Sequence, residues 1–309
     1  MYKTVNETSL AVLGKLAKGV RSFGLEALLN VARDCFDEVF MNIRYPPLKV
    51  RISNTIELHG LLRHRSFLAG LCSGTYESLL QRLLKRSLEV LGAGTVIVDG
   101  GAHIGFYSLT VSRVLRFEGN ILSFEPDPHN YRTLTFNLKM NRCNNVIPFK
   151  KALSNTTGRG IFYQSSGTIS SSLYDRCDVG SVKLKEIETT NLDLELQDFI
   201  FRSLVLKLDI EGAEVYALRG SKNILENTNK VICFIEMNPS ALRSAGFAPA
   251  HLMHELQVFN TCHFINEPSG RLIVASEVGT EKKGNLFCTK GIVHFKDAFG
   301  QFVDSQLGS

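Results

Sequence analysis

A glycine-rich turn follows one apolar run of the sequence and could bind an anionic ligand. It contains Asp99, Gly100, Gly101, Ala102, His103 and Gly105. Glycines let the backbone approach a ligand closely, and the first N–H groups of a following helix are free to bind an anion. The spacing is G-x-x-x-G rather than the G-x-G-x-x-G of dinucleotide-binding turns, which argues against a nicotinamide cofactor.

Glu125 ends the next apolar run along the chain. A carboxylate at the end of the strand that follows a glycine turn can accept hydrogen bonds from both hydroxyl groups of a ribose. Without the glycine turn, a solvated glutamate would be the better interpretation. Together, the turn and Glu125 predict a site for a cofactor that contains a nucleoside.

A second group of polar residues occupies another strand-to-helix turn. Lys207 lies within an apolar run, and a buried lysine carries a desolvation cost unless carboxylates pair with it. Strand alternation places Lys207 and Asp209 on the same face, Glu211 follows in the turn, and the next strand ends in Glu236. We therefore expect a polar cluster at the carboxyl ends of these strands, where active sites of open α/β sheets lie.

Short apolar runs rich in β-branched residues alternate with segments of helical periodicity. The runs are 96–98, 120–124, 146–149, 204–208 and 231–235, and the helical segments are 104–116, 129–141, 214–226 and 250–259. This alternation is typical of right-handed βαβ crossovers. The predicted fold is therefore α/β, with a doubly wound and mostly parallel sheet.

Other segments lie outside this alternation. Residues 8–42 carry apolar side chains at helical spacing, so we expect an N-terminal helical appendage over 1–70, with a short strand at 48–52. The main domain is expected over 71–295 and a tail over 296–309. A serine- and glycine-rich stretch, 165–172, predicts a surface loop between strands.

The composition limits the kinds of partner and the cellular location that we expect. Lys+Arg 35 and Asp+Glu 30 give a net charge of +5 without a block of like charges, so nucleic acid is not an expected partner. No apolar run reaches the roughly 18 residues of a membrane span and no secretory signal is evident, so a cytoplasmic protein is expected. Seven scattered cysteines indicate neither a disulfide framework nor a zinc knuckle. Weak association with a membrane surface and a homo-oligomer are left open.

Five motifs, in order, resemble those of the FkbM-type methyltransferases. They are GTYE at 74–77, VDGGAHIGFYS at 98–108, FEPDP at 124–128, SSL at 171–173 and KLDIEGAE at 207–214. The sequence differs at His103, where the family usually has asparagine, and at Gly100, where valine is common. The resemblance covers residues 70–290 and implies a Rossmann-like fold that uses S-adenosyl-L-methionine (SAM).

The resemblance also implies roles for individual residues. Asp99, Gly101 and Gly105 would line the methionine part of the cofactor, Glu125 would hold its ribose, and Asp209 would lie near the methionine amine and the transferred methyl group. Family members commonly methylate hydroxyl groups of sugars and glycans. A glycan or small-molecule acceptor and O-methylation are therefore expected.

An alcohol is a poor nucleophile, so methyl transfer to a hydroxyl group needs a base. Asp209, Glu211 and Glu236 are the candidates, with Lys207 organising their charge. A metal bridging Asp209 and Glu211 is the less favoured alternative, because carboxylates so close in sequence more often cap a turn. We expect no metal.

Two other functions fit parts of the sequence. A nicotinamide-dependent oxidoreductase fits the strand, turn and Glu125 but not the glycine spacing. A non-catalytic SAM-binding module is suggested only by the long appendage. Tyr76 and Glu77, just before the main sheet, are expected to close over the cofactor.

Overall fold

The structure, a computed structural model, describes residues 48–165 except 55, 62, 63 and 75, and residues 182–303 except 280. The helices expected over 8–42, the serine-rich loop from 166 onward and the last six residues of the expected tail lie outside these ranges.

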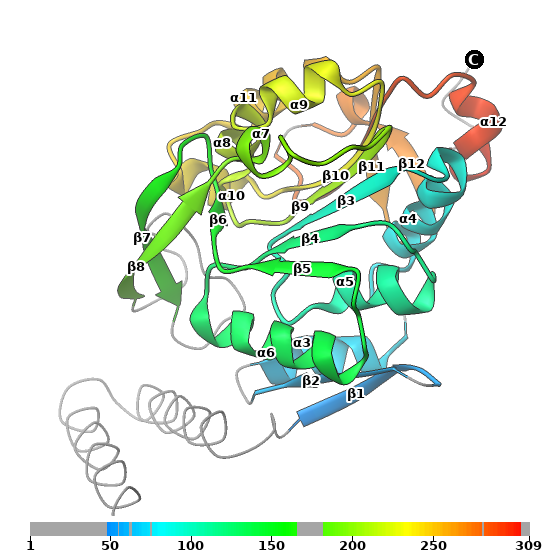
Figure 1. Cartoon of the computed structure of the whole chain (residues 1–309). Coiled ribbons are helices and arrows are strands. Elements are labelled where there is room, and N and C mark those ends of the chain that lie inside the picture. Colours follow the sequence, from blue (N-terminus) through cyan, green and yellow to red (C-terminus); the bar gives the residue numbers. More distant parts are fainter. Residues whose placement is uncertain are drawn as a thin grey trace, which may run out of the picture.

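An eight-stranded sheet forms the centre of the molecule (Figure 1). In spatial order its strands are β12 (Arg271–Val274), β11 (Thr261–Asn266), β13 (Gly284–Lys290), β10 (Lys230–Met237), β9 (Ser203–Leu208), β3 (Thr95–Gly100), β4 (Ile121–Phe124) and β5 (Val146–Phe149). The strands from β10 to β5 pair in parallel, and β13 is antiparallel to β10. These parallel strands are the five that the apolar runs predict, so the doubly wound sheet is confirmed.

Helices cover both faces of this sheet (Figure 1). One face carries α4 (Ser78–Leu91), α5 (Phe106–Leu109), α6 (Pro128–Met140) and α12 (Phe295–Phe299), and the other carries α7 (Leu192–Glu195), α8 (Glu214–Arg219), α9 (Lys222–Asn227), α10 (Pro239–Ser244) and α11 (Pro249–Glu255). A hydrophobic cluster fills each layer, which is why the central strands are apolar on both faces. Among the described residues, none of the helices has the length and apolar character needed to cross a bilayer.

Two of the predicted helices are divided. The segment 104–116 is α5 followed by a π-helical turn, Thr110–Val114, and the segment 214–226 is α8 followed by α9. Gly220 caps α8 at the second break, and a Cβ there would lie 2.1 Å from the carbonyl oxygen of Ser154, so packing requires glycine at this position. Helical periodicity alone gives no sign of such a contact.

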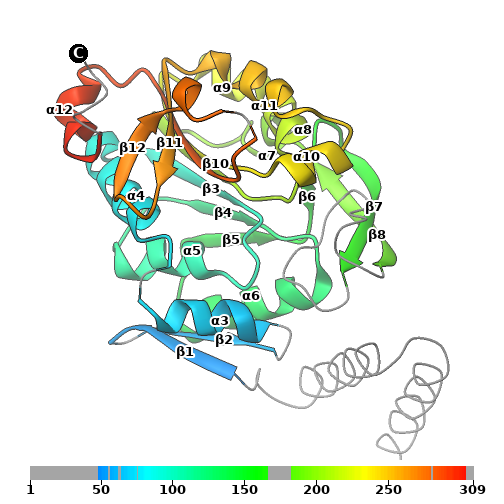
Figure 2. The ribbon, with the colours of Figure 1, turned by 180° about the vertical axis from the view of Figure 1, so that it is seen from behind.

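An antiparallel hairpin of β1 (Leu48–Ser53) and β2 (Ile56–Gly60), followed by α3 (Arg65–Cys72), lies beside α6 (Figure 2). β1 confirms the strand predicted at 48–52. Asn137 of α6 and Asn141, which caps the end of this helix, hold β2. Asn137 accepts from the His59 N–H at 2.9 Å and donates to its carbonyl at 2.9 Å, and Asn141 does the same for Glu57 at 3.2 and 2.8 Å. We call this pair the amide clamp, because each side chain makes the two bonds that a neighbouring strand would make.

The limits expected for the main domain, 71 and 295, stay predictions. Residues on both sides of them share one hydrophobic cluster, in which Leu58 and Leu68 before the first limit and Phe299 and Phe302 after the second are buried. A third, small sheet of β6 (Ala152–Leu153), β8 (Val182–Thr190) and β7 (Gly158–Ser165) flanks the expected serine-rich loop.

The structure contains one disulfide that the cysteine spacing does not predict. Cys262 on β11 and Cys288 on β13 are opposite each other in the strand register, with their Cα atoms 4.1 Å apart, and they form a disulfide. They are 26 positions apart in sequence, so only the pairing of the two strands brings them together. Among the described residues, Cys72, Cys143 and Cys233 are free thiols.

The turns after β3 and β9 touch each other. The Asp209 N–H donates to the carbonyl of Gly100 at 3.1 Å. Gly101 has a φ of +78°, and a Cβ there would lie 1.9 Å from the carbonyl oxygen of Asp209. Glycine is therefore required at this position, both for its backbone conformation and for space.

We expect Gly101→Ala to destabilise the protein more than Gly246→Ala does. Both glycines have similar positive φ values, +78° and +83°, so both substitutions carry the cost of a left-handed alanine, about 1–2 kcal/mol. Nothing lies within 4 Å of the Cβ position of Gly246, so only Gly101→Ala adds a steric overlap, which costs about 1–3 kcal/mol more. Urea unfolding of both variants measures the difference, and equal losses would contradict the close contact.

Candidate active site

A cavity of about 490 Å³ lies at the carboxyl ends of β3, β4, β9 and β10. Its walls include eight residues predicted from the sequence, namely Gly101, Ala102, His103, Glu125, Lys207, Asp209, Glu211 and Glu236. Three other predicted residues, Asp99, Gly100 and Gly105, lie next to this lining rather than in it. The two groups of polar residues recognised in the sequence therefore meet at one cavity.

Glu125 is held from both sides in a buried position, with 5% of its surface exposed. The His103 N–H donates to Oε2 at 2.8 Å, and the Asp127 N–H donates to Oε1 at 2.9 Å. The Asn130 amide also donates to Oε1, at 3.4 Å. Burial, and then the charge of Asp127, raise the pKa of Glu125 to about 8. A carboxylate fixed in this way can accept further hydrogen bonds from hydroxyl groups in the cavity.

The residues next to the lining support the turn. The Ser108 hydroxyl donates to Oδ2 of Asp99 at 2.6 Å, which leaves Oδ1 buried without a hydrogen bond. Gly105 has a φ of +96°, and a Cβ there would lie 2.8 Å from Leu134 on α6. Glycine thus lets the start of α5 pack closely against α6.

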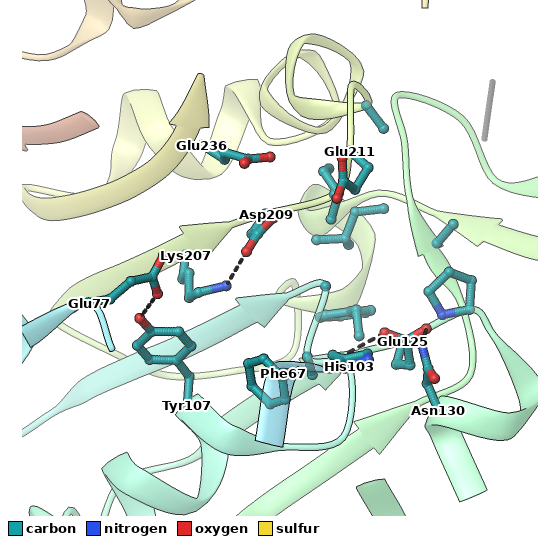
Figure 3. A pocket seen from close by; sticks show the side chains of 18 of the residues that line it. Phe67, Glu77, His103, Tyr107, Glu125, Asn130, Lys207, Asp209, Glu211 and Glu236 are labelled. Atoms are coloured by element: carbon teal, nitrogen blue, oxygen red, sulfur yellow. Dashed lines mark hydrogen bonds and ion pairs between the residues drawn. The ribbon is translucent and has the colours of Figure 1, made fainter. Parts of the chain in front are cut away.

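Lys207 is a buried cation among carboxylates (Figure 3). Its Nζ lies 3.6 Å from Oδ2 of Asp209 and 3.9 Å from Oδ1 of Asp99, and it sits 4.7 Å from the centre of the Tyr107 ring. Burial acts to lower the pKa of Lys207, but the surrounding carboxylates, first Asp209 and then Asp99, outweigh it and raise the pKa. The predicted pairing of Lys207 with carboxylates is confirmed.

Glu77 forms a second polar contact on the same side of the cavity (Figure 3). It accepts a short hydrogen bond from the Tyr107 hydroxyl and another from the Asn285 amide at 3.0 Å. Burial raises the pKa of Glu77, although the bond from Tyr107 partly offsets this. Tyr76 also lines the cavity. The expectation that Tyr76 and Glu77 close over a cofactor stays a prediction.

Three carboxylates meet at the ends of β9 and β10. Asp209, Glu211 and Glu236 each offer an oxygen, and these oxygens lie within 4.8 Å of one another. The spacing is compatible with a divalent cation. Lys283 already forms an ion pair with Oε1 of Glu236 at 3.1 Å, while Oε2 is buried without a hydrogen bond. Burial, followed by the charges of Asp209 and Glu211, raises the pKa of Glu236 to about 9.

Glu214 has a structural role in the turn after β9. Its carboxyl is fully buried and accepts from the Ile210 N–H at 3.1 Å and the Gly212 N–H at 3.0 Å. Burial raises the pKa of Glu214 to about 8. These bonds fix the loop that carries Asp209 and Glu211.

Backbone conformation also sets this cavity apart. Three of its non-glycine residues, Glu77, His103 and Glu211, have left-handed φ values of 43°, 53° and 52°. Such conformations are uncommon for residues with a side chain and concentrate at functional sites.

Sequence reasoning missed several residues of the site. They are Phe67, Tyr107, Asn130, Lys283 and Asn285. Phe67 comes from α3 and contacts the His103 ring at a centroid distance of 5.1 Å. Tyr107 lies directly after the glycine turn and could have been inferred from the first helical turn there. The others belong to segments whose approach to the cavity depends on the tertiary fold.

Comparison with known proteins gives a family match. Residues 99–262, just over half of the chain, match the model of the Methyltransferase FkbM domain. This region contains both turns that line the cavity.

Two curated relatives are methyltransferases. Hexuronic acid methyltransferase AglP of Haloferax volcanii is 29% identical over 152 residues, which cover 49% of this chain and 60% of that protein. Methyltransferase 1 of Beauveria bassiana is 25% identical over 181 residues, which cover 50% of this chain and 72% of that protein. The chain thus spans less than two thirds of the first relative.

The comparison with solved structures gives distant matches, of which two are described. The FkbM methyltransferase of Methylobacillus flagellatus KT is 18% identical, with a TM-score of 0.38, over 66% of this chain and 47% of that one. A Streptococcus mutans protein in complex with SAH is 13% identical, with a TM-score of 0.39, over 68% of this chain and 96% of that one.

The raised pKa values of three buried glutamates predict that the free energy of unfolding falls as the pH rises. In the folded state, Glu125 and Glu214 have pKa values of about 8 and Glu236 of about 9, whereas an unfolded glutamate titrates near 4.5. Between these values only the folded state holds the protons, so its stability is lost as the pH rises through 8 to 9. We expect the free energy of unfolding in urea to fall between pH 6.5 and 9.5.

The variant Glu236→Gln identifies one source of this effect. Because glutamine does not titrate, the fall should shrink by at least about 1.4 kcal/mol, the equivalent of a one-unit change in pKa. Glu226→Gln on exposed α9 is the control and should leave the fall unchanged. An identical pH dependence in all three proteins would show that Glu236 is ionised in the folded protein.

Proposed function

This chain belongs to the family of methyltransferases with an FkbM domain, and on that premise we propose that it transfers the methyl group of SAM to a hydroxyl group of a glycan or a small polyhydroxylated molecule. The observation that carries the proposal is the single cavity that joins Glu125 to the carboxylates of Asp209 and Glu236. The curated relative that is named for hexuronic acid supports a sugar as the acceptor class.

The residues of the cavity fit SAM. A volume of about 490 Å³ is within the range of small-molecule sites. Glu125 is fixed to accept the ribose hydroxyl groups, and Gly101 and Ala102 bring backbone close to the methionine part. The carboxylates of Asp209 and Glu77 flank Lys207 and supply partners for the amine. When bound, SAM supplies an electrophilic methyl group and leaves as S-adenosylhomocysteine (SAH).

Glu236 is the base in this proposal. It lies at the end of β10 with one buried oxygen that has no hydrogen bond, so it can receive the proton of an acceptor hydroxyl group. Asp209 is less suited, because its carboxylate already pairs with Lys207 at 3.6 Å. With a pKa of about 9, Glu236 holds a proton near neutral pH in the protein without SAM. It loses this proton and becomes a stronger base than an ordinary carboxylate when a further positive charge, such as the sulfonium of SAM, lies beside it.

No metal is needed in this proposal, although three carboxylates could hold one. Lys207 and Lys283 already place positive charge beside Asp209 and Glu236, at 3.6 and 3.1 Å. Methyl transfer also leaves no strongly charged leaving group for a cation to stabilise, because a sulfonium becomes a neutral thioether.

We expect the protein to bind SAH and Glu125→Gln to bind it about 10- to 100-fold more weakly, because a buried hydroxyl group that loses its hydrogen-bond acceptor costs about 1–3 kcal/mol. Isothermal titration calorimetry with SAM, SAH and NADH measures this, and Glu226→Gln is the control. Binding of NADH but not of SAH would contradict the proposal and restore the nicotinamide alternative.

We expect Glu236→Gln to lower the rate of methyl transfer about 10²- to 10⁴-fold, the usual contribution of a general base, without weakening SAH binding. The rate is measured with labelled SAM and a cell extract that contains the acceptor, followed by mass spectrometry of the product. Glu211→Gln should have a smaller effect, and EDTA should have none.

Other results of this experiment have distinct meanings. SAH binding without label transfer to any component of the extract would favour the non-catalytic module. A loss of rate with EDTA that added Mg²⁺ restores would show that the three carboxylates hold a metal.

A further inference from the structure

We propose that His64 and Asn130 are positioning residues, which orient Glu125 toward the ribose hydroxyl groups through a buried relay of hydrogen bonds. This inference rests on the proposed SAM site. The relay links the segment before α3, which lies outside the family match, to the carboxylate at the end of β4.

The relay begins with a fixed tautomer of His64, which is 1% exposed. The Leu61 N–H donates to Nδ1 of His64 at 2.9 Å, so Nδ1 carries no proton. A neutral imidazole then has its proton on Nε2. Nε2 lies 2.9 Å from Oδ1 of Asn130 and therefore donates to it.

The donation from His64 fixes the orientation of the Asn130 amide. Since Oδ1 faces the imidazole, the amide nitrogen points the other way, toward Oε1 of Glu125 at 3.4 Å. A flipped amide would place N–H against N–H on one side and oxygen against carboxylate on the other. Both Asn130 and Glu125 are buried, with 8% and 5% exposed, so water is poorly placed to replace these bonds.

The segment that carries His64 and Phe67 also packs against His103, the residue that holds Oε2 of Glu125. The His103 N–H donates to Oε2, and the His103 ring packs edge-on against His64 and Phe67, at centroid distances of 4.9 and 5.1 Å. Oε1 is therefore held by the relay together with the Asp127 N–H, and Oε2 is held by a turn that packs against His64. Figure 3 shows Asn130 and His103 on either side of Glu125.

A purely structural role would have a different consequence. If His64 and Asn130 only stabilised the fold, their loss would weaken the binding of every ligand of the cavity by a similar factor. If they orient Glu125, their loss reduces only the part of the affinity that the ribose hydroxyl groups supply. The readout is thus the ratio of affinities for SAH and for its 2′-deoxy and 3′-deoxy analogues.

Calorimetry with the full chain measures these ratios for the wild type, Asn130→Ala, Asn130→Asp and His64→Gln. We expect the wild type to prefer SAH over at least one deoxy analogue by about 10-fold or more, because the analogue leaves a buried oxygen of Glu125 without its hydrogen-bond partner. Asn130→Ala should reduce that preference to about 3-fold or less. Asn130→Asp keeps the size of the side chain and the acceptor for His64 but removes the N–H that faces Glu125. We therefore expect the same reduced preference for SAH in Asn130→Asp, which provides the test even if Asn130→Ala folds poorly.

Asn141→Ala is the matched control. Asn141 caps the end of the same helix and also contacts the N-terminal segment, through the amide clamp, but its side chain bonds neither to Glu125 nor to the glycine turn. We expect this variant to lower the free energy of unfolding and to keep the preference for SAH. His64→Gln offers an amide donor in place of Nε2–H, so it should retain more of the preference than Asn130→Ala does.

The outcomes separate the two proposals. If the wild type binds no SAH, the proposed function fails. If it binds SAH and its deoxy analogues equally, or if the two Asn130 variants weaken all three ligands by one factor, the relay is overturned. A selective loss of the preference in these variants, and not in Asn141→Ala, supports it.

Discussion

The carbonyl oxygen of Asp209 occupies the space where a side chain on Gly101 would project, 1.9 Å from the Cβ position. This contact fixes the distance between the turn after β3 and the turn after β9, and the Asp209 N–H bond to Gly100 fixes their register. The nucleoside side of the cavity and its carboxylate side are therefore parts of one rigid unit. Every other feature of the site, from the burial of Lys207 to the position of Glu125, depends on that approach.

The charged side chains of the cavity form ion pairs, and two buried carboxyl oxygens, Oδ1 of Asp99 and Oε2 of Glu236, have no hydrogen bond. Lys207 is buried because Asp99 and Asp209 flank it, and Lys283 partly neutralises Glu236. Burying ions in this way contributes little to stability, since desolvation offsets much of the attraction. It does place carboxyl groups with raised pKa values where a proton can be accepted, which is a property of active sites rather than of structural ion pairs.

Much of the fold and half of the site could be predicted from the sequence. The parallel strands were predictable because strands buried on both faces are apolar throughout, and the pairing of Lys207 with Asp209 follows from alternation along a strand. Contacts such as that of Asn130 with Glu125, or of Cys262 with Cys288, depend on how separate elements are placed, and no periodic pattern encodes them. The break at Gly220 has a signal in the sequence, because glycine commonly ends helices, but the neighbouring backbone of Ser154 that requires glycine there does not.

Helix α6 joins the amide clamp and the relay, because Asn130, Asn137 and Asn141 all face the N-terminal segment. Each residue inserted into an α-helix rotates the remainder of the helix by about 100°. An insertion of one residue between Asn130 and Asn137 would consequently rotate the clamp away from β2 while leaving the contact with Glu125 in place. The length of α6, and not only its composition, therefore couples the outer hairpin to the cofactor pocket. Among related proteins, insertions and deletions should be found in the loops on either side of this helix and not within it.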